Sequence, residues 1–561
     1  MTSATGSAGA PSLPSGRIAG SIFAGARSSA VRHALTPIAC GLVLGGCLPS
    51  ARTWPLAAGA LSLWAAADLA SSRRRPDDVT ARTASFAGGI LGLHAVGQCW
   101  LLAGPRDGDA SGLPWGALIL AATLLLQVSW FAGCRAILLY AVRAFRPGTS
   151  TRAIAECLAW AAAWGCADAL RQIGWTGNAY AQAGIAFVDA PGVPALLPIF
   201  GLTTTGALLF GAGWLVAMAV TNLRSRASWA AGAILLAGVV AFLRIGTLVD
   251  DDAPVATGRS IPVLALQTAI DKRIPFDAAR LEHAQARLLS SLRSLPEGGV
   301  LITPETYFAS PRTGEPSRRA FWNAFDDATT DGRRHALVGM PVVRRGSEGD
   351  PVVSNAVVEF APGRISIYGK EQLVPGSEYV PRWLPFAGLS DRLFGRGRML
   401  EEASPEAWRQ PLFVGEDAVG VSICHELAFE LLMADRAREA GWLVNVSEDG
   451  WLRSEAYRRA MRATARARAL EAGLPLLRVA NGGSSALIDG RGRVLASAAN
   501  GQEAAALWQV DSYQGTTFHT RHAGALFLAS PILALAIACA GALLALVARA
   551  RDERRTREAL A

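Results

Sequence analysis

Residues 421–426 read VSICHE, an apolar run that ends at a polar turn. This pattern predicts a buried strand whose end presents Cys424, and proteins commonly hold a nucleophile at such a position. The chain has no second cysteine between Asp250 and Thr520, so Cys424 has no disulfide partner inside this region. The stretch alone leaves two interpretations open, a small buried hydrophobe or a reactive thiol.

The composition of the whole chain is that of a membrane protein. Of its 561 residues 51% are hydrophobic and 18% are charged, and the formal net charge is +9. This is too apolar for one soluble domain. Eight apolar stretches are long enough, or nearly so, to cross a bilayer as helices: 34–49, 55–71, 85–104, 115–141, 153–171, 196–221, 229–249 and 524–548. The fifth of them contains two carboxylates, Glu156 and Asp168.

Arginine clusters follow alternate apolar stretches and therefore predict an orientation. They lie at 73–75, 143–152, 224–226 and 549–557. Positively charged loops stay on the cytoplasmic side, so the insert, defined as residues 250–520, is expected on the opposite face. The predicted organisation is a disordered cytoplasmic leader at 1–33, a transmembrane region of about seven helices at 34–249, the insert, a transmembrane helix at 524–548 and a basic cytoplasmic tail at 549–561. The basic charge reflects orientation and lipid contact, and no nucleic-acid partner is predicted.

The insert alternates short β-branched runs with helical stretches. Strands are predicted at 263–267, 299–303, 336–343, 355–360, 419–424, 442–446, 476–479 and 485–489, and helices at 276–295 and 456–472. This alternation predicts a layered α/β domain of about 250 residues, which is enough for a substantial core.

Two further charged residues stand at strand ends in the insert. Glu305 follows the second predicted strand, and Lys370 lies in a segment that reads SIYGKEQLVP. Each alone is typical of a solvated charge or a salt-bridge partner. Together with Cys424 they supply what acyl transfer through a thiol requires. A carboxylate can take the thiol proton, and an ammonium can depress the thiol pKa, which would let the thiolate form at neutral pH, and stabilise the oxyanion.

At these residues the chain resembles the nitrilase, or carbon–nitrogen hydrolase, superfamily, and within it the membrane-embedded branch of apolipoprotein N-acyltransferases. The resemblance implies a Glu-Lys-Cys triad on an α-β-β-α sandwich attached to a polytopic helical membrane domain. It covers the insert in order, and the segment Tyr180-Ala181-Gln182 resembles a loop of that branch outside the cytoplasm. The matching segments are 304–305, 339–341, 355–358, 368–370, 373–375, 378–381, 423–426, 445, 449–451, 466–471, 478, 481, 483, 485 and 488–489.

Carried over residue by residue, the resemblance implies a nucleophile at Cys424, a general base at Glu305 and an oxyanion-stabilising cation at Lys370. Glu378 matches a second carboxylate beside the triad, and Glu426 matches the acidic residue two positions after the nucleophile. The implied reaction is a two-step exchange. A phospholipid acylates the thiol, and the α-amine of a diacylglyceryl-cysteine apolipoprotein then takes the acyl chain.

The expected substrate-binding residues are His425, Trp451 and Trp383. A histidine at 425 could serve as a second base, but along a strand it would point to the opposite face, which favours a pocket-lining or structural role. Trp383 lies in an apolar stretch that is either a membrane-dipping arm or a plain surface loop. The chain departs from the branch's usual pattern at Thr303, Gly376, Ser377, His425, Ala460, Met461 and Gly482.

The resemblance implies a multi-pass protein of the bacterial inner membrane, with the insert on the periplasmic side. We expect a monomer whose partners are the phospholipid donor, the apolipoprotein acceptor and membrane lipid. No cofactor is expected, and no Cys/His cluster has metal-ligand spacing. Two other functions stay open at this point: a membrane-bound nitrilase relative of conjugal-transfer type, acting as an amidase or acyltransferase on another substrate, and an inactive membrane scaffold.

Overall fold

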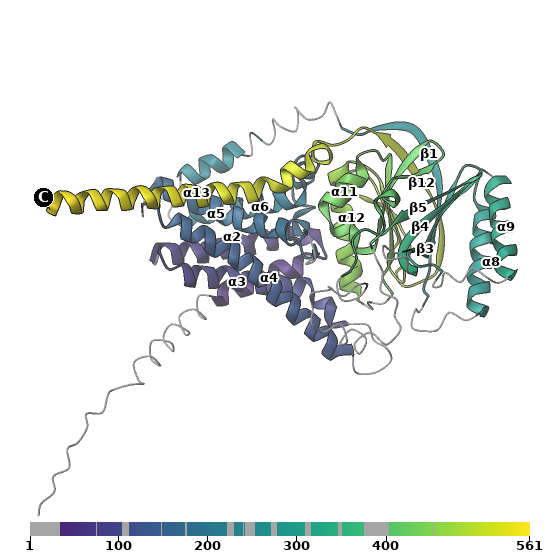
Figure 1. Ribbon diagram of the computed structural model, residues 1–561, viewed down its shortest axis with the longest axis horizontal. Helices are drawn as coiled ribbons and strands as arrows, with labels where there is room; N and C mark the ends of the chain where they lie inside the picture. The colour runs from purple at the N-terminus through teal and green to yellow at the C-terminus, as the bar shows by residue number, and fades with distance from the viewer. Residues whose placement is uncertain are drawn as a thin grey trace, which may run out of the picture.

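A computed structural model gives the fold of the chain. It describes residues 34–560 except 75, 104–111, 147–148, 174–176, 222–228, 239–240, 242–252, 271–277, 309–315, 332, 346–350, 375–377, 379–402, 451 and 453. Two parts are distinct in Figure 1, a bundle of helices and a β-sheet domain formed by the insert.

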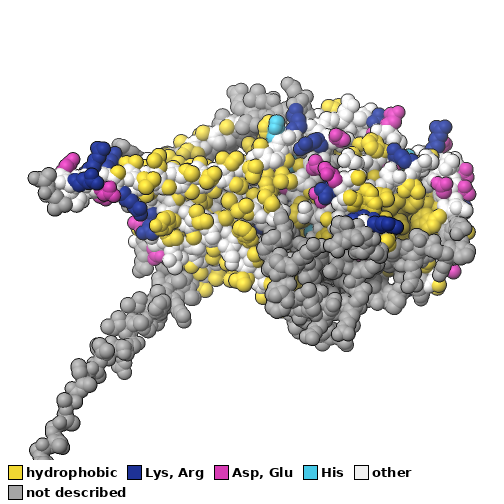
Figure 2. Space-filling model, viewed as in Figure 1, with side chains coloured by type: hydrophobic (Ala, Val, Ile, Leu, Met, Phe, Trp, Pro, Cys, Tyr) yellow, Lys and Arg dark blue, Asp and Glu magenta, His cyan; other side chains and the backbone are white. Residues whose placement is uncertain are grey.

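The bundle contains a helix at each predicted apolar stretch. Its helices are Ala34–Cys47, α2 (Trp54–Arg74), α3 (Val79–Gly97), α4 (Gly112–Val142), α5 (Ser150–Leu170), α6 (Val193–Thr221), Trp229–Gly238 and α13 (Phe518–Leu560). Four of them, α4, α5, α6 and α13, are long and apolar enough to cross a membrane. Apolar side chains cover the visible face of the bundle in Figure 2, while charged side chains gather at the end of α13 and on the insert. The chain is a membrane protein. α13 continues past 548, so the predicted tail is helical.

The two carboxylates of the fifth apolar stretch are paired inside the bundle. Glu156 accepts hydrogen bonds from Arg82 and Arg152, each at 3.2 Å. Asp168 accepts from Arg171 at 2.5 Å. Ionisable groups at membrane depth are costly unless they face the bundle interior and find partners. These pairs explain how α5 carries carboxylates and still packs among apolar helices.

The insert folds as two sheets of six strands each. The first has the order β12-β1-β2-β3-β4-β5 and the second the order β11-β10-β9-β8-β7-β6. The strands of the first are β1 (Val255–Gln267), β2 (Val300–Ile302), β3 (His335–Arg345), β4 (Pro351–Ala361), β5 (Arg364–Gly369) and β12 (Ala504–Gln514). Those of the second are β6 (Leu412–Val414), β7 (Asp417–Ile423), β8 (Trp442–Glu448), β9 (Leu476–Asn481), β10 (Ala486–Ile488) and β11 (Val494–Ser497).

Helices cover the outer face of each sheet, so the expected α-β-β-α sandwich is confirmed. α8 (Ala278–Ser294) and α9 (Pro316–Asp331) pack on the first sheet, and α11 (Glu430–Ala437) and α12 (Glu455–Ala472) pack on the second. Apolar residues of both sheets form the core between them. α11 and α12 also contact α6 and α13, so they lie between the sheets and the bundle (Figure 1).

The two ends of the insert meet at one sheet edge. β1 pairs antiparallel with β12, and Val255 lies opposite Gln514. β12 is followed within a few residues by α13. The first and the last strand of the insert therefore lie side by side, next to the start of α13.

A buried ion pair joins the residue after β8 to the middle of β9, and it generates a stability prediction. Arg478 binds both oxygens of Asp449, at 2.8 and 2.9 Å, and neither side chain is exposed. Asp449→Asn leaves the guanidinium buried without its counter-charge, which we expect to lower the free energy of unfolding by about 3–5 kcal/mol. Thermal unfolding in detergent measures the change. The matched control is Glu503→Gln, which breaks a half-exposed pair with Arg287 and should cost less than about 1 kcal/mol. Equal effects of the two substitutions would contradict the prediction.

Candidate active site

Three strand ends bring the predicted triad to one end of the sandwich. Glu305 follows β2, Lys370 follows β5 directly, and Cys424 follows β7 directly. The two sheets face each other, so residues at these ends come from both sides of the core. All three side chains are buried.

Glu305 is held by three donors. Its Oε1 accepts from Lys370 Nζ at 2.9 Å and from Asn355 Nδ2 at 2.7 Å. Its Oε2 accepts from the backbone N–H of Glu448 at 2.8 Å. A Cβ on Gly339 would lie 2.1 Å from the Pro304 carbonyl oxygen, so only glycine permits this close approach of β3 to the Glu305 turn. The carboxylate is therefore fixed in orientation.

Lys370 lies between two carboxylates. Besides Glu305, its ammonium contacts Glu378 Oε1 at 2.5 Å. The other oxygen of Glu378 accepts from Val374 N–H at 2.8 Å, which fixes the segment that follows Lys370. Burial, with Glu305 nearby, raises the pKa of Glu378, although Lys370 opposes this shift. One cation and two carboxylates thus share a site with a net negative charge.

Cys424 has an unusual backbone conformation. Its φ is +55°, in the left-handed region that L-residues other than glycine seldom adopt. Thr306, next to Glu305, also has a positive φ. The side-chain amide of Asn445 donates to the Cys424 carbonyl oxygen at 3.2 Å. Such strain persists where surrounding contacts enforce it, as at sharp turns that present a nucleophile.

The expected thiolate at neutral pH is wrong for the free protein. Burial raises the pKa of Cys424, and the charges of Glu305, Glu378 and Asp449 raise it further. Lys370 lowers this pKa, as the sequence analysis expected, but its effect is outweighed. The thiol therefore keeps its proton until a base removes it during attack, which gives the base a larger role than the cation.

Glu426 connects two strands instead of facing the reacting atoms. Its Oε1 accepts from the N–H groups of Glu371 and Gln372, at 2.6 and 3.0 Å. Its Oε2 accepts from Ile423 N–H at 2.7 Å and from the Tyr368 hydroxyl at 2.9 Å. Burial raises its pKa, while the backbone N–H donors oppose the shift. Glu426 thus holds the residues after Lys370 against the strand that ends at Cys424.

His425 is a buried neutral imidazole. Its ring packs edge-on against Phe429 at 5.4 Å, and neither ring nitrogen has a hydrogen-bond partner among the described residues. Burial, and then the charge of Lys370, hold its pKa well below the usual value. This environment agrees with a pocket-lining role and disfavours a base. The other expected binding residues, Trp451 and Trp383, lie outside the described residues, as do Gly376 and Ser377.

Of the departures from the family pattern, Thr303 has a structural explanation. Its hydroxyl accepts from Gly339 N–H at 2.9 Å and so fastens the Glu305 turn to β3.

An aromatic cluster from both halves of the chain lies beside the triad, and sequence reasoning did not identify it as part of the site. Trp100 of the bundle packs edge-on against Tyr180 and at a tilt against Tyr457 of α12, with ring centroids 5.1 and 4.9 Å apart. Burial is the main cause that raises the pKa of each tyrosine, and Cys424 is among the neighbouring groups that add to the shift. The Tyr457 hydroxyl is buried, and its ring lies 6.4 Å from that of Tyr180. The segment Tyr180-Ala181-Gln182 was the available signal, whereas nothing in the sequence marked Tyr457.

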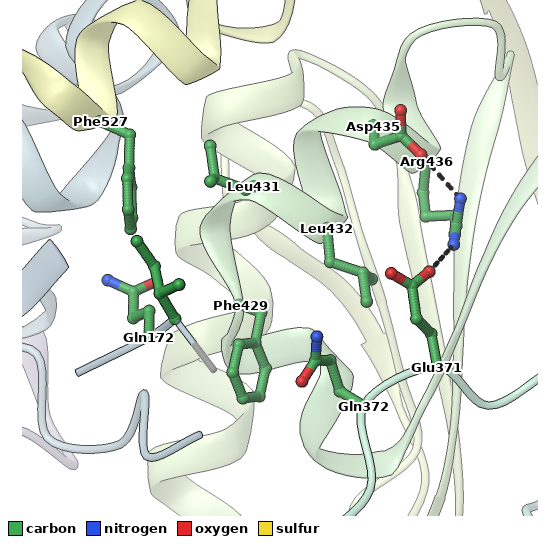
Figure 3. A pocket seen from close by; sticks show the side chains of 10 residues that line it. Gln172, Glu371, Gln372, Phe429, Leu431, Leu432, Asp435, Arg436 and Phe527 are labelled. Atoms are coloured by element: carbon green, nitrogen blue, oxygen red, sulfur yellow. Dashed lines mark hydrogen bonds and ion pairs between the residues drawn. The ribbon is translucent and has the colours of Figure 1, made fainter. Parts of the chain in front are cut away.

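A separate cavity of about 290 Å³ lies where α11 meets the bundle (Figure 3). Ile173, Phe429, Leu431, Leu432 and Phe527 form its apolar wall, and Gln172, Glu371, Gln372, Asp435 and Arg436 form its polar wall. No triad residue lines it. Arg436 pairs with both carboxylates of the polar wall, at 2.7 and 2.8 Å, and Arg409 lies 3.6 Å from Glu371, so each carboxylate already has a partner within the protein.

Comparisons with known proteins agree with the sequence resemblance. Residues 278–517 match the carbon–nitrogen hydrolase family, so this part of the chain is a carbon–nitrogen hydrolase domain. Proteins named apolipoprotein N-acyltransferase are similar along both halves. The one from Azotobacter vinelandii is 29% identical over 80% of this chain and 84% of its own, and the one from Bordetella bronchiseptica is 27% identical over 79% and 85%. The predicted resemblance is confirmed.

Solved structures similar to the chain come from the nitrilase superfamily. Saccharomyces cerevisiae Nit3 has a TM-score of 0.33 and 18% identity, covering 45% of this chain and 90% of its own. A carbon–nitrogen hydrolase from Helicobacter pylori also has a TM-score of 0.33, with 16% identity, covering 48% and 94%.

The raised thiol pKa predicts how Cys424 reacts with a neutral alkylating agent. Because the thiol stays protonated, carboxymethylation by iodoacetamide should be slow at pH 7 and should still accelerate with pH above pH 9. Glu305→Gln removes a negative charge that raises this pKa, so the variant should alkylate faster than the wild type at a given pH. Peptide mass spectrometry that separates Cys424 from the other cysteines measures the rate. Glu503→Gln, far more exposed, serves as control and should leave it unchanged. A plateau below pH 8 in the wild type would contradict the raised pKa.

Proposed function

We propose that this chain, which carries a carbon–nitrogen hydrolase domain on a membrane bundle and is similar in both parts to apolipoprotein N-acyltransferases, is itself an N-acyltransferase. It would move a fatty acyl chain from a phospholipid to the N-terminal amine of a diacylglyceryl-cysteine apolipoprotein through a thioester. The observation that carries the proposal is the contact of Lys370 Nζ with Glu305 and Glu378 beside a strained Cys424. A nucleophilic thiol, a carboxylate base and an ammonium that stabilises the oxyanion are the groups that acyl transfer through a thiol requires.

In the first step the thiol attacks the ester carbonyl of the phospholipid. Glu305 removes the thiol proton as the sulfur–carbon bond forms, because the raised pKa of Cys424 leaves little free thiolate. The ammonium of Lys370 stabilises the negative charge that develops on the carbonyl oxygen. The ester carbon–oxygen bond then breaks, and the leaving alkoxide receives the proton from Glu305. The products are an acyl-Cys424 thioester and a lysophospholipid.

In the second step the α-amine of the acceptor attacks the thioester carbonyl. Glu305 takes a proton from the attacking amine, the nitrogen–carbon bond forms, and the carbon–sulfur bond breaks. The departing thiolate of Cys424 then receives the proton that Glu305 took from the amine. The acceptor leaves as an amide and the site returns to its starting state.

Glu378 supports both steps through Lys370. One oxygen contacts the ammonium and the other accepts from Val374 N–H, so Glu378 holds Lys370 in place for the developing oxyanion. We assign Glu426 to positioning, and His425 with the aromatic pair Tyr180 and Tyr457 to substrate binding. The ring nitrogens of His425 are buried without a partner among the described residues, so they are groups that a substrate could satisfy. Trp451 and Trp383 stay proposed binding residues on the resemblance alone.

The membrane location fits substrates with long acyl chains. Each CH₂ that leaves the bilayer costs about 0.8 kcal/mol, so a lipid cannot be withdrawn into water for reaction. A catalytic domain that packs on the membrane helices through α11 and α12 can receive the lipid without that cost. We propose the bacterial inner membrane, with the insert on the periplasmic side, from the arginine clusters between apolar stretches.

The remaining expectations are part of the same proposal. The faces of α11 and α12 that point away from the sheets are covered by the bundle, which supports a monomer. An amidase or acyltransferase of conjugal-transfer type, and an inactive scaffold, are not favoured, because the relatives that match along the chain are named apolipoprotein N-acyltransferases.

The reaction predicts a covalent intermediate. Purified protein given phospholipid vesicles should gain one acyl chain that hydroxylamine removes, and Cys424→Ala should gain none. Glu305→Gln should form the thioester at least about a hundredfold more slowly, because general-base catalysis contributes that much. Intact-protein mass spectrometry measures the adduct. Complementation of cells that lack their own N-acyltransferase tests the acceptor. A wild type that hydrolyses small amides and never acylates a diacylglyceryl peptide would overturn the proposal.

The orientation predicts which sites a membrane-impermeant maleimide reaches. Glu416→Cys places a thiol at a side chain that is 88% exposed on the insert. Arg557→Cys places one on the exposed end of α13. In cells whose outer membrane alone is permeabilised, the maleimide should label the Glu416→Cys variant. It should label the Arg557→Cys variant only after lysis. The reverse pattern would contradict a periplasmic insert.

A further inference from the structure

Helix α6 is broken where the insert contacts it. Gly201 has φ +70° and ψ 175°, which is not helical, and Pro198 precedes it by three residues. A second helical segment therefore begins at Leu202. The first N–H groups of any helix have no acceptor within the helix, and in a membrane bundle they must find one elsewhere.

Two carboxylates of the insert supply these acceptors. Glu471 of α12 accepts from Leu202 N–H at 2.6 Å, and Glu430 of α11 accepts from Thr203 N–H at 2.8 Å. Both side chains are buried. Negative charge at a helix N-terminus is favoured by the helix dipole as well as by the hydrogen bonds. The start of this membrane segment is thus capped by the catalytic half of the chain.

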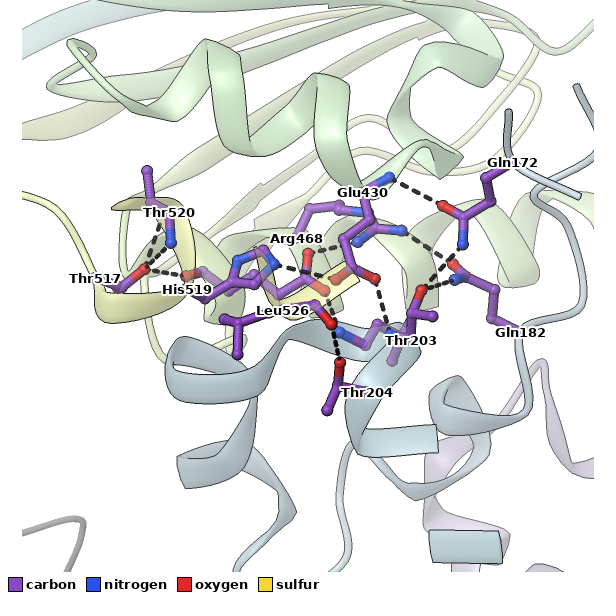
Figure 4. A network of polar contacts seen from close by, with 12 residues as sticks. Gln172, Gln182, Thr203, Thr204, Glu430, Arg468, Thr517, His519, Thr520 and Leu526 are labelled. Carbon is purple, nitrogen blue, oxygen red and sulfur yellow. Dashed lines mark hydrogen bonds and ion pairs between the residues drawn. The ribbon is translucent and has the colours of Figure 1, made fainter. Parts of the chain in front are cut away.

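His519 of α13 completes the contact from a third element. Its Nε2 lies 3.1 Å from Glu430 Oε1, the oxygen that Thr203 does not use. A Cβ on Gly201 would lie 2.2 Å from Glu430 Oε1 and 2.4 Å from His519 Nε2, so the pair forms only against glycine. Figure 4 shows the two side chains converging over the break in α6.

The same network reaches the turn that carries the nucleophile. Arg468 pairs with Glu471 at 2.5 Å and donates to the carbonyl oxygens of Leu427 and Ala428, at 3.0 and 2.8 Å. These carbonyls belong to the short helical turn Cys424–Ala428. Glu430 begins α11 only two residues after that turn. The C-terminal end of the nucleophile turn is therefore connected to the bundle by buried polar contacts, through Arg468 and through Glu430.

A metal ion is an alternative occupant of this cluster. Single ligand atoms of Glu430, Glu471 and His519 lie within 4.8 Å of one another. However, Arg468 already pairs with Glu471, and backbone N–H groups occupy an oxygen of each carboxylate. A cation would have to displace donors that the fold itself supplies, so the cluster is a contact between protein elements.

We propose that Glu430 and His519 form a positioning pair, which holds the nucleophile turn at a fixed place relative to the membrane helices so that Cys424 meets lipid-borne acyl chains. The inference rests on the proposed acyl transfer. Neither residue contacts Glu305, Lys370 or Cys424. Loss of the pair should leave the chemistry intact and loosen the alignment of the thiol with a substrate fixed in the bilayer, where small displacements are costly.

Two acyl donors separate positioning from chemistry. The full-length protein in nanodiscs is given either the phospholipid of the disc or p-nitrophenyl acetate, a soluble ester that reaches Cys424 from water. Glu430→Gln and His519→Gln should each slow thioester formation from phospholipid roughly tenfold, through the maximal rate and not KM, and should change acetylation by less than about twofold. The double variant should be no slower than either single one, because the two residues act as one unit.

The matched control is Asp435→Asn, an exposed carboxylate on the same helix, which should match the wild type with both donors. Equal losses with phospholipid and p-nitrophenyl acetate would overturn the pair as a positioning device, and so would rates equal to the wild type. A wild type that is acetylated but never acylated by phospholipid would instead overturn the proposed function, and this inference with it.

Discussion

The buried ammonium of Lys370 is the interaction on which the rest of the site depends. A lone charge in this interior would be costly, so the two carboxylates that contact it are a condition of its burial as well as parts of the chemistry. Each partner is in turn fixed by backbone donors, Glu305 by Glu448 and Glu378 by Val374. The arrangement is preorganised before any substrate arrives, which is the property that electrostatic catalysis needs.

Much of this could be predicted from the sequence because the triad lies at the ends of buried strands. Runs such as 419–424 and 442–446 are apolar and β-branched, and the structure has β7 and β8 there. Strand β5, directly before Lys370, was not predicted, because it lies at the edge of its sheet and only its last two residues are buried, so it lacks a continuous apolar run. The alternation of elements predicted a layered α/β domain, and the sandwich was implied by the family resemblance. The pairing of β1 with β12 depends on a contact between residues about 250 positions apart.

The thiol pKa could not be predicted, for a physical reason. The sequence shows that a lysine is present, but the pKa depends on burial and on every charge that the fold brings near, and here these outweigh the lysine. The aromatic residues that the bundle contributes to the site could not be predicted either, because they depend on contacts between distant parts of the chain. Tyr180 and Tyr457 come from different halves of the chain, and only their meeting at Trp100 places both near Cys424.

The pairing of β1 with β12 has a consequence for the order of events during synthesis. The first sheet cannot be completed until its last strand has left the ribosome, and β12 is followed almost at once by α13. Until β12 is made, β1 has an unpaired edge. Pairing between strands so far apart in the sequence is slow, and the unpaired edge is prone to aggregation. The strand that completes the catalytic domain and the final membrane helix are therefore synthesised almost together. A chain that stops before β12 has an incomplete first sheet.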